Sequence, residues 1–202
     1  MTTISDFYYH LLSISDGYYT SMSTQYLVYD NPARVTWSLQ DEDSSLQQLE
    51  ALTTALAIGR LLDRIVILPR FHCFENVTLN MYSCPLNSLL SIAVFDSQFN
   101  ELYRENSFLS HPKVPVKVRR SITRSRYFTS VLEARNTSTP VTVSQIELQR
   151  EFRSVSSRVL SVGVLYDVRV TFDLSDKQSE FNAAVKKAIE TSDYRQLSMK
   201  RP

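Results

Sequence analysis

Residues 51–73, ALTTALAIGRLLDRIVILPRFHC, join two apolar patterns that differ in their spacing. In the first pattern, apolar residues recur every three or four positions on two neighbouring stripes, as in a helix with a wide buried face. The second pattern, IVILP at 65–69, is apolar without alternation, as in a parallel strand buried on both faces. The stretch therefore predicts a buried helix that leads into a central strand. The helical stripes consist of Leu46, Leu49, Leu52, Leu56 and Gly59, and of Ala51, Ala55, Ile58 and Leu62.

A short strand is predicted just before this helix, because QYLVYD at 25–30 is apolar and aromatic and is followed by an Asn-Pro pair. The helix itself should begin at Ser44, which forms a capping box with Gln47. Strand, helix and strand then make a βαβ unit, in which 26–29 and 65–68 pair in parallel. We expect three leucines of this unit to be almost fully buried, namely Leu52, Leu56 and Leu62.

The chain continues to alternate between helical and strand patterns. A buried strand is predicted at 159–164. Further helices are expected to begin near Pro85, near Asp96, at the capping box of Ser144 and Glu147, and at Ser175 with Gln178. The alternation predicts an α/β fold with one Rossmann-like domain, a mainly parallel sheet flanked by helices. We assign this domain to 25–192, a poorly defined N-terminal segment to 1–24 and a tail to 193–202.

Composition excludes several classes of function. The chain has 202 residues, 43% of them hydrophobic, and a net charge of +1, so it is a globular protein with no global attraction to nucleic acid. Its apolar runs are shorter than the roughly 20 residues that cross a bilayer. Only three glycines occur, and the turn before the first helix carries Asp41, Glu42 and Asp43, which would repel a phosphate. We therefore expect no nucleotide cofactor in this chain.

No motif for metal binding or nucleophilic catalysis is present. The three histidines, His10, His72 and His111, lack the spacing of a metal site, and two cysteines cannot form a four-cysteine zinc site. There is no G-x-S-x-G nucleophile motif. Glu105 and Arg104 in YRENSFL either contact a substrate or pair with neighbouring residues, and the sequence alone favours pairing with neighbours. We therefore predict no metal, and the catalytic residues stay unknown.

Cys73 and Cys84 are the chain's two cysteines. On their own they fit two buried thiols as well as a disulfide. Two glycosylation acceptor patterns begin at Asn76, between the cysteines, and at Asn136. Together these patterns favour an oxidising compartment, and we predict a disulfide between Cys73 and Cys84. The chain would then belong to a longer secretory protein, with a cytoplasmic location as the alternative.

The segment 113–126 contains six Lys or Arg residues and no acid, and it reads as a solvated loop. Single-stranded nucleic acid binding would need aromatic residues interleaved with these charges, and only Tyr127 and Phe128 lie nearby. We expect no nucleic-acid partner. Contact with an anionic ligand or with a partner domain is the alternative to a solvated loop.

Three motifs in this order resemble lumenal glycosyltransferase-related proteins: ALAIGRLLDRIVILPRFHC, CPLNSLLSI and YRENSFLSHPKVP. The resemblance is to the plant arabinosyltransferase and xylosyltransferase group of nucleotide-diphospho-sugar transferases and, more distantly, to O-fucosyltransferases. It extends over roughly residues 25–189, and VLSVGVLYDVRVTF is similar to a late segment of the same group. DRIVILP departs from the usual Asn-Arg-Thr start of the strand.

The resemblance implies a two-domain enzyme in which the second Rossmann-like domain holds most of the nucleotide-sugar, with a His-x-Arg motif after a strand. This chain contains no His-x-Arg. We therefore expect the acceptor-side half of such an enzyme, in the Golgi lumen, with a glycan or glycoprotein acceptor and a second domain as partners. A nucleotide-sugar donor is expected only with that second domain. The alternative is a non-catalytic domain that retains the fold and binds glycan or protein.

Candidate site residues follow from the strand ends, where open α/β sheets bind ligands. The candidate acceptor-binding residues are Arg70, His72, Arg104, Glu105 and His111. The candidate anion-binding residues, which would stabilise a departing diphosphate, are Lys117, Arg119 and Arg120. Glu105 is also the candidate base for the acceptor hydroxyl.

Overall fold

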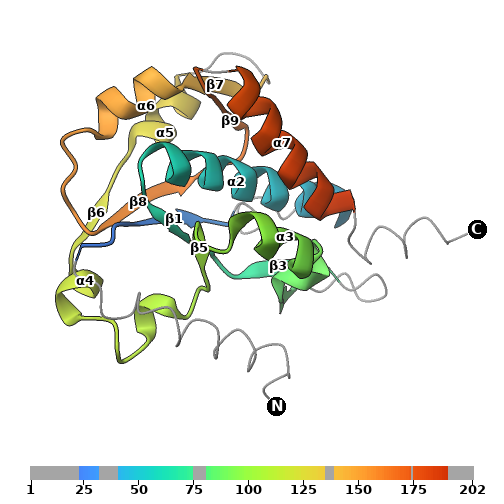
Figure 1. Cartoon of the computed structure of the whole chain (residues 1–202), viewed down its shortest axis with the longest axis horizontal. Coiled ribbons are helices and arrows are strands. Elements are labelled where there is room, and N and C mark those ends of the chain that lie inside the picture. The colour runs from blue at the N-terminus through green and yellow to red at the C-terminus, as the bar shows by residue number, and fades with distance from the viewer. Residues whose placement is uncertain (1–22, 32–40, 75–80, 135–138, 174, 191–202) are drawn as a thin grey trace, which may run out of the picture.

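The computed structural model describes residues 23–31, 41–74, 81–134, 139–173 and 175–190. Its centre is a five-stranded parallel sheet with the strand order β5-β2-β1-β8-β6 (Figure 1). The strands are β1 (Tyr26–Asp30), β2 (Ile65–Ile67), β5 (Tyr103–Arg104), β6 (Ile122–Arg124) and β8 (Val159–Val164). This arrangement confirms the predicted α/β fold.

In the described part of the chain, two small sheets accompany the main one. β3 (Phe71–Phe74) and β4 (Met81–Cys84) form an antiparallel pair, and β7 (Val141–Ser144) and β9 (Val168–Thr171) form a parallel pair. The α-helices are α2 (Asp41–Leu61), α3 (Ile92–Phe99), α4 (Val116–Arg120), α5 (Tyr127–Glu133), α6 (Gln145–Phe152) and α7 (Ser175–Glu190). The 3₁₀ helices of the described residues are η3 (Leu86–Ser88) and η4 (Phe108–Ser110). None of the described helices is long and apolar enough to cross a bilayer.

The βαβ unit forms as predicted. β1 and β2 pair in parallel, with Tyr26 opposite Ile65, and β2 lies inside the sheet between β5 and β1. Leu52 and Leu56 are 2% and 0% exposed. The expectation for Leu62 was wrong, because α2 ends at Leu61 and Leu62 lies half-buried in the turn that follows.

Several predicted boundaries were also wrong. α2 begins at Asp41, so Ser44 lies inside the helix; acidic residues suit the positive end of the helix dipole. Asp96 lies within α3, where its carboxylate accepts a hydrogen bond from Tyr103. The segment 113–126 is not a loop, because it contains α4 and β6. The helix after the Ser144 capping box was expected to extend to about Ser157, but α6 ends at Phe152.

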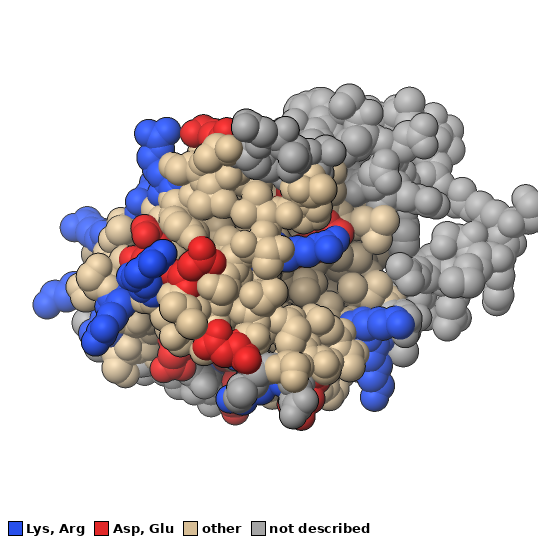
Figure 2. Space-filling view, turned by 90° about the horizontal axis from the view of Figure 1, so that it is seen from above, with Lys and Arg blue, Asp and Glu red and all other residues tan. Residues whose placement is uncertain are grey.

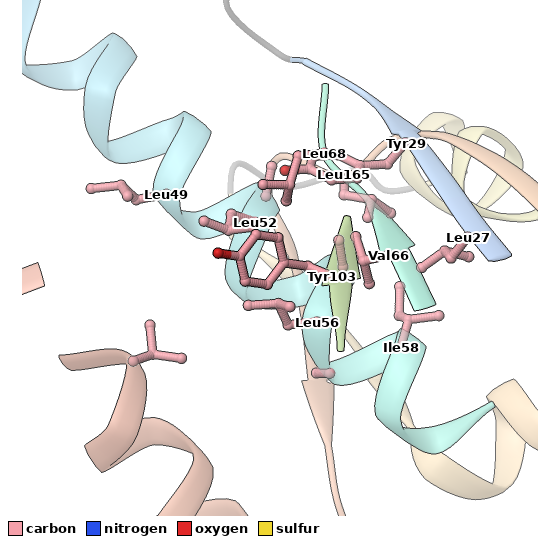
Figure 3. Packing of buried hydrophobic residues seen from close by; sticks show 14 of the residues in the cluster. Leu27, Tyr29, Leu49, Leu52, Leu56, Ile58, Val66, Leu68, Tyr103 and Leu165 are labelled. Atoms are coloured by element: carbon pink, nitrogen blue, oxygen red, sulfur yellow. The ribbon is translucent and has the colours of Figure 1, made fainter. Parts of the chain in front are cut away.

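The apolar core lies on both faces of the sheet. On one face, α2 packs its leucines against the sheet; Figure 3 shows Leu52 and Leu56 beside Val66 and Tyr103. The other face is covered by the connection between β5 and β6, which contributes Phe108, Val114 and Val118. This connection crosses from one edge of the sheet to the other.

Gly59 allows the end of α2 to approach β2 closely. A Cβ atom at this position would lie 2.7 Å from the carbonyl oxygen of Arg64 and 2.7 Å from Cγ2 of Val66. Glycine within a helix costs about 1 kcal/mol relative to alanine, and here it permits the tight packing between helix and strand. The side chain of Arg64 then donates hydrogen bonds to three main-chain carbonyls, those of Tyr26, Val155 and Ser157.

Candidate functional site

The parallel strands of the main sheet place their carboxyl ends along one edge, which is where open α/β sheets bind ligands. The chain leaves β1 towards β2 on one side, whereas β8, on the other side of β1, is reached only after β6. The strand order therefore reverses between β1 and β8. Such a switch point leaves a crevice outside the strand ends.

A hollow of about 460 Å³ lies at this point. It is formed by the ends of three neighbouring strands and by one residue of the β3–β4 hairpin. Its lining residues are Tyr29, Asp30 and Asn31 from β1 and after it, Pro69 and Arg70 after β2, His72 on β3 and Val164 on β8. We call it the switch-point hollow.

A second hollow, of about 140 Å³, lies beside the first and shares Pro69 and Arg70 with it. It is formed by the ends of β2 and β5, the β3–β4 hairpin and the segment around η3, and we call it the hairpin hollow. Its polar lining residues are Arg70, Ser83, Asn87, Glu105 and Asn106, and its apolar surfaces include Leu86, Ile92 and Tyr103. Arg70, which is exposed, thus stands between the two hollows.

A disulfide holds the hairpin that borders both hollows. Cys73 and Cys84 are bonded, with their Cα atoms 5.7 Å apart, which confirms the predicted pairing. Both cysteines are 7% exposed, and Cys84 lines the hairpin hollow. The bond ties β3 to the far end of β4, next to the helical turn at 86–88.

Gln48 of α2 fixes the edge of the sheet through hydrogen bonds. Its Nε2 donates to the carbonyl of His72 and its Oε1 accepts from the N–H of His72, both at 2.8 Å. The same Oε1 accepts from Nδ2 of Asn31, which also donates to the carbonyl of Arg70. One buried amide pair therefore joins the segments that follow β1 and β2 to strand β3.

We expect Gln48→Leu to lower the free energy of unfolding by about 1 to 3 kcal/mol, because it removes the hydrogen bonds of Gln48 to the main chain of His72 and to the amide of Asn31. Glu50→Leu is the matched control, since Glu50 is exposed on the same helix. Urea denaturation of the two variants checks this expectation. Equal losses of stability in the two variants would contradict it.

Two tyrosines lie beneath the hollows. Tyr29 is 2% exposed, and its hydroxyl has no hydrogen-bond partner among the described residues. Burial raises the pKa of Tyr29 far above its ordinary value, so this group stays neutral. Tyr103 lines the hairpin hollow and donates a hydrogen bond to Asp96. Burial raises the pKa of Asp96, and the hydrogen bond from Tyr103 opposes this rise.

The structure brings together three of the five candidate acceptor-binding residues: Arg70, His72 and Glu105. The other two line neither hollow. Arg104 is 6% exposed, and its Nη1 donates to the carbonyls of Asn100 and Tyr103. His111 follows η4, and its Nδ1 accepts from the N–H of Lys113.

The candidate anion-binding residues lie elsewhere. Lys117, Arg119 and Arg120 belong to α4, which packs through Val118 against a cluster that includes Tyr26 and Val159. These two residues begin β1 and β8, so α4 lies near the amino ends of the strands. The basic helix is thereby separated from the two hollows. The glycosylation candidates Asn76 and Asn136 lie outside the described residues.

Sequence reasoning missed several residues that line the hollows: Tyr29, Asp30, Asn31, Asn87 and Asn106. Asp30 and Asn31 follow a strand that the sequence did predict, so the rule applied to Arg70 would have identified them. Asn87 and Asn106 gave no comparable signal, because the turn at 86–88 and the two-residue strand β5 are too short for a sequence pattern.

No known protein family, curated protein or solved structure matches this chain. Within the part of the chain that the structure describes, no group of three or more His, Cys, Asp or Glu residues is arranged to hold a metal ion.

Proposed function

We propose that this chain is the acceptor-side domain of a sugar transferase and that its two hollows bind the acceptor glycan. The observation that carries the proposal is the pair of hollows at the carboxyl edge of a parallel sheet, joined by Arg70. Ligand sites of α/β proteins occur at this edge and combine apolar walls with a few polar groups.

The polar groups of the hollows suit sugar hydroxyls, which both donate and accept hydrogen bonds. Asp30 and Glu105 are acceptors, Arg70 is a donor, and the amides of Asn87 and Asn106 can be either. Apolar surface for the carbon face of a sugar ring comes from Leu86, Ile92 and Tyr103. An acceptor glycan therefore finds complementary groups in both hollows.

The charge of the hollows suits an acceptor better than a nucleotide-sugar donor. Arg70 is the one Lys or Arg residue among the described residues that line them, and the same hollows are lined by the carboxylates of Asp30 and Glu105. A departing diphosphate needs fixed positive charges or N–H groups directed at its phosphates. The donor is thus assigned to a second Rossmann-like domain, and the lumenal location is supported by the disulfide.

Within this proposal, Glu105 is the group that accepts the proton of the acceptor hydroxyl when the second domain is present. Glu105 lines the hairpin hollow after β5, and its Oε2 accepts a hydrogen bond from Ser107. The alternative function is glycan or protein binding without transfer, which the mixed charges of the hollows also fit. Binding is common to both functions, and only turnover distinguishes them.

The test is to measure binding of the purified chain to a panel of neutral oligosaccharides. We expect Arg70→Ala to weaken glycan binding about tenfold or more, because a hydrogen bond from a charged group contributes roughly 1.5 to 3 kcal/mol. Arg169→Ala is the matched control, since Arg169 is exposed on β9 and lines neither hollow. The isolated chain should release no nucleoside diphosphate from nucleotide-sugars.

Three results would contradict the proposal. If no oligosaccharide binds, or if Arg70→Ala and Arg169→Ala bind equally well, the hollows are not the glycan site. If the isolated chain turns over a nucleotide-sugar, and Arg119→Ala with Arg120→Ala abolishes this turnover, the chain is a complete enzyme and the division between two domains is wrong.

A further inference from the structure

Strand β6 is an edge of the main sheet, on the side opposite to β5. Among the described strands it pairs with β8 alone, and Figure 1 shows it next to α4, which precedes it in the chain. All three of its residues are exposed, and Ile122 is 48% exposed. An exposed edge strand offers unpaired main-chain groups to another chain.

The hydrogen bonds to β8 establish which main-chain groups of β6 face outward. Ser121 accepts a hydrogen bond from the N–H of Val159, and Ser125 donates one to the carbonyl of Ser161. Main-chain groups alternate in direction along a strand. The N–H and C=O groups of Ile122 and Arg124 therefore face away from the sheet, where no other described strand lies beside them.

This edge is strongly basic. Residues 106–132 contain no Asp or Glu, and the six basic residues of 113–126 all lie within this range: Lys113, Lys117, Arg119, Arg120, Arg124 and Arg126. Five of the six are exposed, and the buried Nε of Arg119 has no hydrogen-bond partner among the described residues. Figure 2 shows one face of the molecule, on which basic and acidic side chains are mixed.

The positive charge of this edge indicates which kind of chain can pair with β6. A second copy of this chain pairing through the same strand would bring Arg124 and its basic neighbours against their own counterparts, and like charges facing each other across strands are destabilising. An acidic extended segment has the opposite charge, and Ile122 offers it an apolar contact. We propose that β6 binds an extended acidic segment of a partner protein by strand addition. This site is independent of the proposed glycan site.

The binding mode predicts a role for both the main chain and the charge. The probe is a fluorescent eight-residue peptide that alternates glutamate with valine, titrated against the full chain. We expect saturable binding that weakens as salt rises. A peptide with lysine in place of glutamate should not bind, and neither should the glutamate peptide with N-methyl groups on alternate residues.

Two substitutions at Arg124 separate charge from main-chain bonding. Arg124→Gln removes the charge and keeps the outward N–H, and we expect it to weaken peptide binding roughly twofold to fivefold. Arg124→Pro also removes the outward N–H, at a position where an edge strand tolerates proline, and it should weaken binding by a further factor of roughly three to ten. Unfolding curves of both variants verify that the fold persists.

Any of the following outcomes overturns the proposal. If the glutamate peptide does not bind, or if the lysine or N-methylated peptide binds equally well, strand addition by an acidic segment is excluded. If Arg124→Pro and Arg124→Gln bind equally, the main chain takes no part. If a sulfated oligosaccharide displaces the peptide and the N-methylated peptide binds as well as the parent, the surface binds polyanions in general.

Discussion

Replacing Leu56 with alanine is expected to lower the free energy of unfolding by about 2 to 5 kcal/mol, which is the range for removing a buried leucine side chain. Leu56 is 0% exposed and lies in the cluster between α2 and the sheet (Figure 3). Its removal leaves a cavity at the centre of the βαβ unit. Chemical denaturation followed by circular dichroism measures the loss.

Leu46→Ala is the matched control for this prediction. Leu46 lies on the same helix and was assigned from the sequence to the same apolar stripe, yet it is 46% exposed. Its truncation should change the stability by less than about 1 kcal/mol, because little buried area is lost. If the two substitutions cost the same, α2 does not pack on the sheet through Leu56, and the arrangement of helix and sheet is wrong.

The contrast between these leucines shows how far the sequence determines the fold. Periodicity identified the helix and the strand at 65–67, and it predicted the parallel pairing of this strand with β1. A strand that is buried on both faces leaves a strong pattern, because its apolar residues follow one another without alternation. Periodicity did not determine where the buried stripe ends. Leu46 and Leu62 continue the pattern at its two ends, but a helix is covered only where the sheet extends beneath it.

The candidate site was less accessible to sequence reasoning. Arg70, His72 and Glu105 were found because they follow strands or strand-like runs. Arg104 was included for the same reason, but its guanidinium donates hydrogen bonds to the carbonyls of Asn100 and Tyr103 and lines neither hollow. A pattern of residues gives the strand end but not the direction of each side chain. The role of Gln48 gave no signal, because it depends on hydrogen bonds between segments that are far apart in the sequence.

The second large effect is expected from the disulfide. Reducing the bond between Cys73 and Cys84 should lower the free energy of unfolding by about 2 to 3 kcal/mol, because the closed loop restricts the unfolded chain. The chain has no other cysteine, so a reducing agent acts on this bond alone. Urea denaturation with and without dithiothreitol measures the difference.

The disulfide should matter for binding as well as for stability, because Cys84 lines the hairpin hollow and Cys73 follows His72 on the strand that borders the other hollow. Cys73→Ala with Cys84→Ala is therefore expected to weaken glycan binding at temperatures where the chain is still folded, while peptide binding at β6 persists. Gln48→Leu should also weaken glycan binding and leave peptide binding unchanged, since it releases the same hairpin from α2. If glycan binding and peptide binding are lost together in either variant, the cause is global unfolding, and the hairpin has no specific role in the glycan site.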